Sequence, residues 1–552
     1  MTVEYNNSYK VDWDFEIMAD DIVGNEGNRI LGRDAQRNNI LAARVVSETV
    51  KTTLGPMGMD KMLVDRVGNV VVTNDGVTIL EEMDIEHPAA KMVVEIAKSQ
   101  EKEVGDGTTT AVMLAGKFLE NAEKLLDMKI HPTVICRGYR WAGDKAQEIL
   151  KSLAVDISSR DELVKVAQTA MTGKGVEYLR EKFGEIVVDA VDVVAEGNKI
   201  DLGDIRIEKQ KGRAIDESEL IRGVVIDKER INLEMPSRVE GARIALIEEA
   251  LEVRSPEMDA RISVSTPEQL TSFLGREDVV LREKVELIKG SGANVVFVQK
   301  GVDELVQHYL ARAGIYAVRR VPRSDMQNLA KATGGKIVSK LSEISREDLG
   351  SAELVEERKD GEDGMTYVMG CSNPKAITIL IRGGTEHIVD EVERAVEDAL
   401  GDVAAALRNS KVVAGGGAVE IELSRRLRNY AKGLAGRERL AVDEFASAME
   451  FIPTTLAENA GMDPIDVLTE LKSKHDAGDK NAGLNLFTNK IENVLEARII
   501  EPYKIKSQAV TSASEVAIMI LRIDDVMASS GRSGGGMPSG MGGMPGGYGG
   551  GY

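Results

Sequence analysis

The segment Gly105-Asp106-Gly107-Thr108-Thr109-Thr110 leads directly into a helical pattern, and together these two features suit a phosphate–metal site. Apolar residues then return at steps of three and four, at Ala111, Leu114, Ala115, Phe118, Ala122 and Leu125. The glycines let the backbone approach a ligand, and the threonines offer hydroxyls and free N–H groups where the helix dipole favours an anion. Asp106 would repel a phosphate unless a cation lay between them, and Mg²⁺ prefers such oxygens. An ordinary helix N-cap by threonine stays open as the alternative.

The bulk composition restricts the class of protein. A chain of 552 residues exceeds one hydrophobic core, so we expect about three to four domains. The net charge of -21 argues against a general binder of nucleic acid or anionic membranes, so we expect neither as a partner. Two cysteines are too few for a disulfide framework. The start of the chain does not resemble a signal peptide, and no apolar run reaches the ~18 residues of a membrane span, so we expect a cytoplasmic protein.

Helical patterns near both ends of the chain flank a mixed middle. The helical patterns cover 38–50, 89–102, 110–126, 133–152, 386–409, 416–434, 438–460 and 464–475, with helix expected on to about 528. Between about 200 and 375, helical patterns alternate with strand-like segments at 223–226, 242–247, 294–299 and 317–321. This order indicates an α/β layer inserted into a mainly helical domain.

Three segments do not fit these patterns. Residues 1–30 are polar, and we expect an arm that orders only by docking. Residues 531–552 are rich in Gly and Met and should be disordered because they cannot bury a core. Residues 251–285 are charged and contain two prolines, yet carry several large apolar side chains. They form either an ordinary surface helix pair or an exposed arm that contacts a partner.

Four further features could contribute to the same site. Asn74-Asp75-Gly76, between strand-like runs at 69–73 and 77–80, predicts a hairpin turn that exposes a carboxylate. Asp398 lies at the edge of the buried stripe of its helix, as a salt-bridge partner or as a site residue. Gly415-Gly416-Gly417 either lets the backbone approach a bound ring or sugar closely, or is a flexible connection between helices. Lys174, between two glycines, either senses a phosphate or is simply solvated.

Neither a P-loop nor the protein-kinase motif set is present. Phosphoryl transfer needs a metal, phosphate donors and a group that positions water, and the scattered segments supply these residue types. In chain order, five strings resemble the group II chaperonins, the branch of the thermosome and the eukaryotic cytosolic chaperonin. They are Thr53–Leu63, Thr73–Leu80, Gly105–Thr110, Val396–Leu400 and Val413–Gly417. Residues 251–285 lie where that branch carries a built-in lid protrusion.

The resemblance implies a multidomain α and β fold. It has a mainly helical equatorial domain from both chain ends, a small discontinuous intermediate domain and an α/β apical domain with a helical protrusion. The implied limits are 1–152 and 406–530 (equatorial), 153–217 and 371–405 (intermediate), 218–370 (apical, with the protrusion at about 251–285) and 531–552 (tail).

The resemblance also implies roles for individual residues. Asp75 and Asp398 would position and activate the attacking water, and Asp106 would bind Mg²⁺. The implied nucleotide-binding residues are Leu54, Gly55, Pro56, Asn74, Gly107, Thr108, Thr109, Thr110, Lys174, Gly416, Asn481, Ala482, Gly483 and Glu501. Among these, Gly416 and Glu501 would lie by the ribose and 481–483 near the base, while Lys174 would report the γ-phosphate to the lid.

The function implied is that of an ATP-dependent chaperone that encloses non-native protein clients. Copies of this chain, with or without paralogous subunits, would form two stacked rings with roughly sixteen subunits in total. Two other classes stay open. A small-molecule phosphotransferase that uses ATP predicts a soluble acceptor and a small oligomer. A structural ring or filament protein would use ATP only to regulate its assembly.

Overall fold

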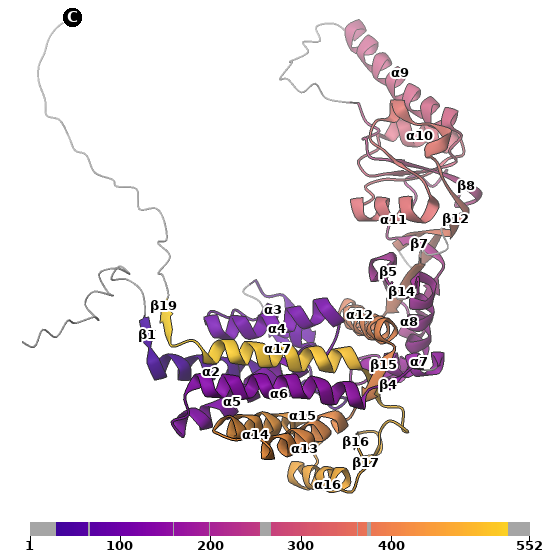
Figure 1. Ribbon diagram of the computed structural model, residues 1–552. Coiled ribbons are helices and arrows are strands. Elements are labelled where there is room, and N and C mark those ends of the chain that lie inside the picture. The colour runs from indigo at the N-terminus through magenta and orange to yellow at the C-terminus, as the bar shows by residue number, and fades with distance from the viewer. Residues whose placement is uncertain are drawn as a thin grey trace, which may run out of the picture.

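The computed structural model describes residues 29–64, 67–157, 159–197, 199–253, 267–360, 363–371 and 377–527. The predicted N-terminal arm and C-terminal tail lie almost wholly outside these residues, as do residues 254–266 of the predicted protrusion. Three modules follow one another along an elongated molecule, which we call the helical body, the middle module and the distal module (Figure 1).

The helical body combines two stretches of chain that are far apart in the sequence. Its helices are α2 (Gly32–Lys51), α3 (Gly76–Glu82), α4 (Pro88–Val104), α5 (Thr108–Asp127), α6 (Pro132–Leu153), α13 (Ala418–Lys432), α14 (Glu438–Met449), α15 (Phe451–Asn459), α16 (Pro464–Asp476) and α17 (Tyr503–Leu521). The apolar repeat of α5 is buried between helices from both stretches. Near its middle, Phe118 stacks on Phe445 with ring centroids 4.1 Å apart, and Tyr139 meets Phe445 edge-on. This packing joins the two chain ends into one core.

Short strands connect and extend the helical body. Their pairs are β1 (Arg29–Leu31) with β19 (Asp525–Met527), β2 (Lys61–Val64) with β3 (Val70–Thr73), and β16 (Ala482–Asn485) with β17 (Lys490–Asn493). A further sheet has the order β18 (Ile500–Pro502), β15 (Lys411–Ala414), β4 (Val155–Asp156). It lies where the chain passes between the helical body and the middle module (Figure 1).

The middle module packs three helices on a small sheet. The helices are α7 (Arg160–Ala170), α8 (Arg180–Val194) and α12 (Glu386–Asn409), and the sheet has the order β5 (Ile205–Lys211), β14 (Ile377–Gly383), β6 (Glu219–Ile221). All seven residues of β14 are buried, because neighbouring strands and helices cover them. A capping box at Ser159 and Glu162 begins α7, and the Thr385 side chain caps α12.

The distal module is an α/β layer, as the alternation predicts. Its seven-stranded sheet has the order β10 (Tyr316–Val318), β9 (Val295–Val298), β8 (Arg238–Ile247), β12 (Gly350–Asp360), β13 (Asp363–Cys371), β7 (Gly223–Ile226), with β11 (Ile337–Val338) beside β8. Helices α9 (Pro267–Ser291) and α10 (Glu304–Arg312) pack in one core cluster, and α11 (Arg323–Thr333) packs in another. The C-terminal half of α9 buries Leu281, Val285 and Ile288, so it is part of the module's core.

Several elements differ from the prediction. Residues 77–80 are helical in α3 and not a strand, because Asp75 caps that helix, and β3 pairs instead with the earlier strand β2. The helix expected from 464 to about 528 is interrupted by β16, β17 and β18, and the helix expected at 438–460 is divided at Glu450. In contrast, α12 has the predicted bounds.

The predicted domain limits remain predictions, and some elements do not follow them. Helix α12 continues past residue 405 and β6 lies in the sheet of the middle module. Among the helices that the structure describes, none has both the length and the apolar character that crossing a membrane requires.

Candidate functional site

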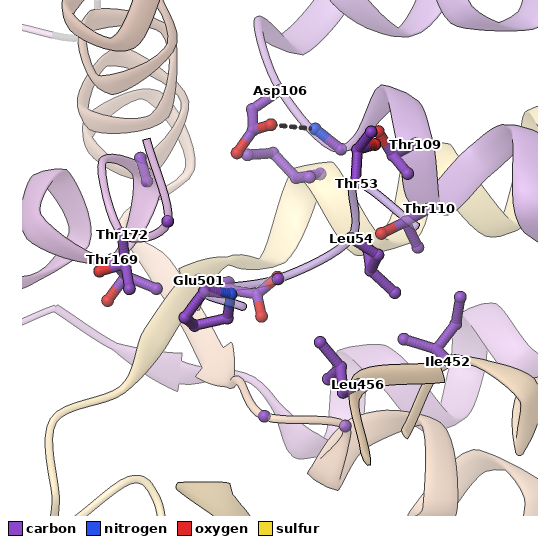
Figure 2. Close-up of a pocket in the computed structure, with 18 of the residues that line it drawn as sticks. Thr53, Leu54, Asp106, Thr109, Thr110, Thr169, Thr172, Ile452, Leu456 and Glu501 are labelled. Atoms are coloured by element: carbon purple, nitrogen blue, oxygen red, sulfur yellow. Dashed lines mark hydrogen bonds between the residues drawn. The ribbon is translucent and has the colours of Figure 1, made fainter. Parts of the chain in front are cut away.

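A pocket lies between the helical body and the middle module. Of the predicted site residues, those that line it are Leu54, Gly55, Pro56, Asn74, Asp75, Asp106, Gly107, Thr108, Thr109, Thr110, Lys174, Gly416 and Glu501. Four others, Asp398, Asn481, Ala482 and Gly483, do not line it. Leu54, Ile452 and Leu456 gather on one side of the pocket, while Asp106 lies well away from them (Figure 2). The pocket thus has an apolar side and a polar side.

The polar side is the loop that begins α5. Gly107 is the N-cap, with φ 79° and no side-chain hydrogen bond to the helix, so the threonine N-cap alternative is wrong. A Cβ on Gly107 would lie 2.6 Å from Cγ2 of Ile505, so only glycine fits this position. The N–H of Gly107 donates to Oδ1 of Asp106 at 2.6 Å (Figure 2). With no side chain capping the first turn, its N–H groups and threonine hydroxyls can serve an anion.

The Asp106 loop is fixed from behind. Nε2 of Gln100 donates to the carbonyls of Asp106 and Ile505, at 2.9 and 3.2 Å. Gln100 is fully buried, so these bonds tie α4, the loop and α17 together. The loop is therefore held in place without any ligand, as a binding site needs.

Asp75 lies at the start of α3, beside the Asp106 loop. Its Oδ2 accepts hydrogen bonds from the N–H and the hydroxyl of Thr78, both at 2.8 Å. The neighbouring Asn74 donates from Nδ2 to the carbonyl of Gly173 at 2.9 Å. That bond joins the helical body to the loop after α7, which belongs to the middle module.

Lys174 and Asp398 form an ion pair across the middle module, with both side chains mostly buried. Burial lowers the pKa of Lys174, but Asp398, Asp106 and Asp75 outweigh it and raise that pKa. Lys174 lines the pocket, whereas Asp398 lies behind it on α12. A lysine ammonium is therefore the positive charge that balances the acidic groups of this region.

Gly416 and Glu501 occupy a different part of the pocket. Gly416 has φ 56°, and its carbonyl accepts from the N–H of Leu484 at 2.8 Å. Nζ of Lys506 lies 2.8 Å from carboxylate oxygens of both Glu501 and Glu420. Burial opposes the charge of Lys506, but the two carboxylates outweigh it and raise its pKa. The triad fixes Glu501 at the pocket wall.

The predicted base contact at 481–483 is not on the pocket wall. Asn481 precedes β16, and Ala482 and Gly483 are its first two residues. Their neighbours Leu484, Leu486 and Phe487 line the pocket instead. Together with Leu54, Ile452 and Leu456 they provide an apolar surface that could cover an aromatic ring.

Sequence reasoning also missed two charged residues, Asp402 and Lys506, which line the pocket. Asp402 follows Asp398 by one helical turn, and this i, i+4 spacing is a signal that could have found it. No comparable signal marks Ile452 or Leu456, because an apolar helix face looks the same whether it meets a core or a ligand.

The donor set fits a magnesium ion that is shared with a ligand. Within the described parts of the chain, no group of three or more His, Cys, Asp or Glu side chains could hold a metal ion by itself. Mg²⁺ commonly uses one or two carboxylates and completes its shell with phosphate oxygens and water. Asp106, beside open N–H groups, offers that combination.

The fold and the pocket define a multidomain α/β protein with a pocket between its helical body and its middle module. The chain belongs to the TCP-1/cpn60 chaperonin family, whose model matches residues 46–530. It is 60% identical to a thermosome subunit of Methanopyrus kandleri over 507 residues, 91% of this chain and 93% of that protein. It is 56% identical to the thermosome subunit beta of Archaeoglobus fulgidus over 522 residues, 93% and 96% of the two chains. A Pyrococcus horikoshii thermosome subunit is also 56% identical, over 92% and 95%. These similarities assign the chain to the group II chaperonins.

Proposed function

We propose that this chain is an ATP-hydrolysing subunit of a double-ring molecular chaperone that closes over non-native protein clients. The observation that carries the proposal is the convergence of Asp75, Asp106 and Lys174 on one pocket, with Asp398 paired to Lys174 behind it. These groups come from both the helical body and the middle module. A triphosphate bound there would be sensed by both modules at once.

Each side of the pocket would bind a different part of the nucleotide. The N–H groups and hydroxyls at the start of α5 would donate to the phosphates, and Asp106 would hold Mg²⁺. When bound, the ion neutralises phosphate charge and orients the γ-phosphate. Gly416 and Glu501 would lie along the ribose. The apolar surface of Leu54, Ile452 and Leu456 would cover the base, a role that the resemblance implies for 481–483.

Hydrolysis requires Asp398 to be released from Lys174. The ammonium of Lys174 pairs with Asp398 in the structure, and the γ-phosphate would offer it a stronger anionic partner. The freed carboxylate would accept a proton from water as the water oxygen bonds to the γ-phosphorus. The bond from that phosphorus to the bridging oxygen then breaks, leaving ADP and phosphate. Asp75, with one oxygen engaged by Thr78, would position the water with the other.

The same contacts would drive closure. Asp398 belongs to α12 of the middle module, whereas the phosphate loop belongs to the helical body. ATP would therefore bind best when the modules approach, and this difference in affinity drives the movement. We assign the helical body, middle module and distal module to the equatorial, intermediate and apical domains. The lid protrusion would include the start of α9.

Both alpha and beta thermosome subunits of Archaeoglobus fulgidus are relatives of this chain, which supports rings that combine paralogous subunits. We propose a particle of roughly sixteen subunits in two stacked rings, each ring closed by repeated contacts between neighbouring subunits. The cytoplasmic location remains a prediction from the sequence.

The test combines three measurements on the full-length protein. We expect release of phosphate from ATP with no added acceptor, double rings in electron micrographs, and ATP-dependent refolding of a chemically denatured client. A requirement for a small-molecule acceptor would favour a phosphotransferase. Rings that hydrolyse ATP but leave the client aggregated would favour a structural assembly.

A further inference from the structure

Asp402 is a buried carboxylate to which the proposed binding and hydrolysis of ATP give no role. It lines the pocket, yet only 3% of the residue is exposed. Among the described residues, its Oδ1 has no hydrogen-bond partner. An ionised carboxylate in this position is costly unless a cation or a donor reaches it. Because Asp402 lines a ligand pocket, a bound ligand could supply that cation or donor.

The backbone brings Asp402 to the phosphate loop. Helix α12 touches that loop at Gly401, where an added Cβ would lie only 2.9 Å from Cα of Gly105. Asp402 is the next residue on the helix and Asp106 is the next residue on the loop. The two carboxylates therefore flank one contact between the middle module and the helical body.

The charges around Asp402 are mainly negative. Burial is the largest influence on Asp402 and raises its pKa; Asp106, Asp398 and Glu501 raise it further, and Lys174 lowers it. Lys174 is already paired with Asp398, and Lys506 with Glu501 and Glu420. Both lysines that line the pocket are thus engaged by other carboxylates.

A triphosphate would add further negative charge at this point, and one Mg²⁺ on Asp106 would offset only part of it. We propose that Asp402 binds a second divalent cation, of the Mg²⁺ or Mn²⁺ class, jointly with the phosphates of the bound nucleotide. One carboxylate plus phosphate oxygens and water is an ordinary ligand set for Mg²⁺. This inference rests on the proposed ATP site.

The second ion should bind only together with the nucleotide. In the described part of the chain no cluster of three metal-binding side chains exists, so the protein alone does not hold this ion. Phosphate oxygens have to complete the shell. The ion therefore arrives with the nucleotide and leaves with it.

The experiment counts ions and nucleotides on the assembled full-length protein. Equilibrium dialysis with Mn²⁺ and a non-hydrolysable ATP analogue gives the number of each bound per subunit. We expect two Mn²⁺ per bound nucleotide in the unmodified protein and one in Asp402→Asn. Without nucleotide we expect no tightly bound Mn²⁺.

Two further variants complete the design. Asp390→Asn makes the same chemical change about three turns earlier on α12. Asp390 pairs there with Lys209 at 2.9 Å, and this variant should still bind two ions. Asp402→Glu keeps the carboxylate and should retain more of the second ion than Asp402→Asn. It also serves as a check if the amide variant fails to fold.

The outcomes separate the two proposals. One Mn²⁺ per nucleotide in the unmodified protein would overturn the second cation, for example because Asp402 takes up a proton instead, and would leave the ATP site intact. Two ions in Asp402→Asn would also overturn it, because the second ion would then lie elsewhere. No bound nucleotide at all would overturn the proposed function itself.

Discussion

Lys174 and Asp398, 224 positions apart in the sequence, form a buried ion pair that holds the loop after α7 against α12. Lys174 faces the pocket and Asp398 lies behind it, so Lys174 stands between the pocket and the proposed catalytic carboxylate. This arrangement gives each partner a separate, measurable role.

Removing Lys174 should destabilise the middle module. Lys174→Met leaves Asp398 mostly buried without its partner, at a cost on the order of 3 kcal/mol. Asp398→Asn in the same chain should recover a large part of the loss, because it removes the orphaned charge. Scanning calorimetry of the two single variants and the double variant measures this coupling. Additive losses would show that the pair contributes no stability.

Asp398→Asn should separate binding from hydrolysis. The amide keeps the shape of the side chain but cannot accept the proton of water, so we expect phosphate release to fall roughly 100-fold or more. Nucleotide affinity should change little, because the phosphate loop is untouched. Asp390→Asn, on the same helix, should hydrolyse ATP at the original rate. Comparable rates for the two variants would remove Asp398 from the catalytic role.

Gly107→Ala should weaken nucleotide binding. The alanine Cβ would lie 2.6 Å from Cγ2 of Ile505, and the alanine backbone would have to adopt φ 79°. The loop must therefore shift. The matched control is Gly461→Ala, where φ is 69° and no atom lies within 4 Å of the new Cβ. Both variants should lose about 1 kcal/mol of stability from backbone strain. Titration with a fluorescent ATP analogue should show weaker binding for Gly107→Ala alone.

Glu422 should make the helical body sensitive to acid. Its buried side chain accepts from His475, Arg425 and Arg426 at 2.9, 2.8 and 2.6 Å. Burial would raise its pKa, but these hydrogen bonds outweigh burial and lower the pKa of Glu422 to about 2. A carboxyl whose pKa is lowered by folding stabilises the protein above its ordinary pKa. That stability, on the order of 3 kcal/mol, is lost as the pH falls from about 4.5 towards 2.

The comparison of pH profiles checks this assignment. Glu422→Gln should be less stable than the unmodified protein at neutral pH, and the difference should shrink through the acid range. Glu470→Gln, a change at an exposed side chain on α16, should leave the profile unchanged. A difference between Glu422→Gln and the unmodified protein that stays constant with pH would contradict the lowered pKa.

The sequence predicted those parts of the fold that depend on local patterns. The bounds of α12 follow from its apolar repeat and from Thr385, which caps its start. The Asn74–Gly76 segment was misread because its turn signal suits a hairpin and a helix start equally well. Only the pairing of β3 with the strand before it, β2, decides between them.

One side of the candidate site could likewise be predicted from a local pattern, and the other could not. The phosphate side is one short motif, so its residues could be read directly from the sequence. The apolar side comes from helices and strands that meet only in the folded chain. For Asp402 the sequence offers only its i, i+4 spacing from Asp398, and its burial beside the pocket becomes visible only when α12 is packed against Gly105.

The most direct test is a structure of the full-length protein with Mg²⁺ and a non-hydrolysable ATP analogue. The account predicts a magnesium ion on Asp106, phosphates at the start of α5, and Lys174 moved from Asp398 to the γ-phosphate. Asp398 should then face the water in line with that phosphate. A triphosphate bound away from Asp106, or a Lys174–Asp398 pair unchanged by the nucleotide, would contradict it.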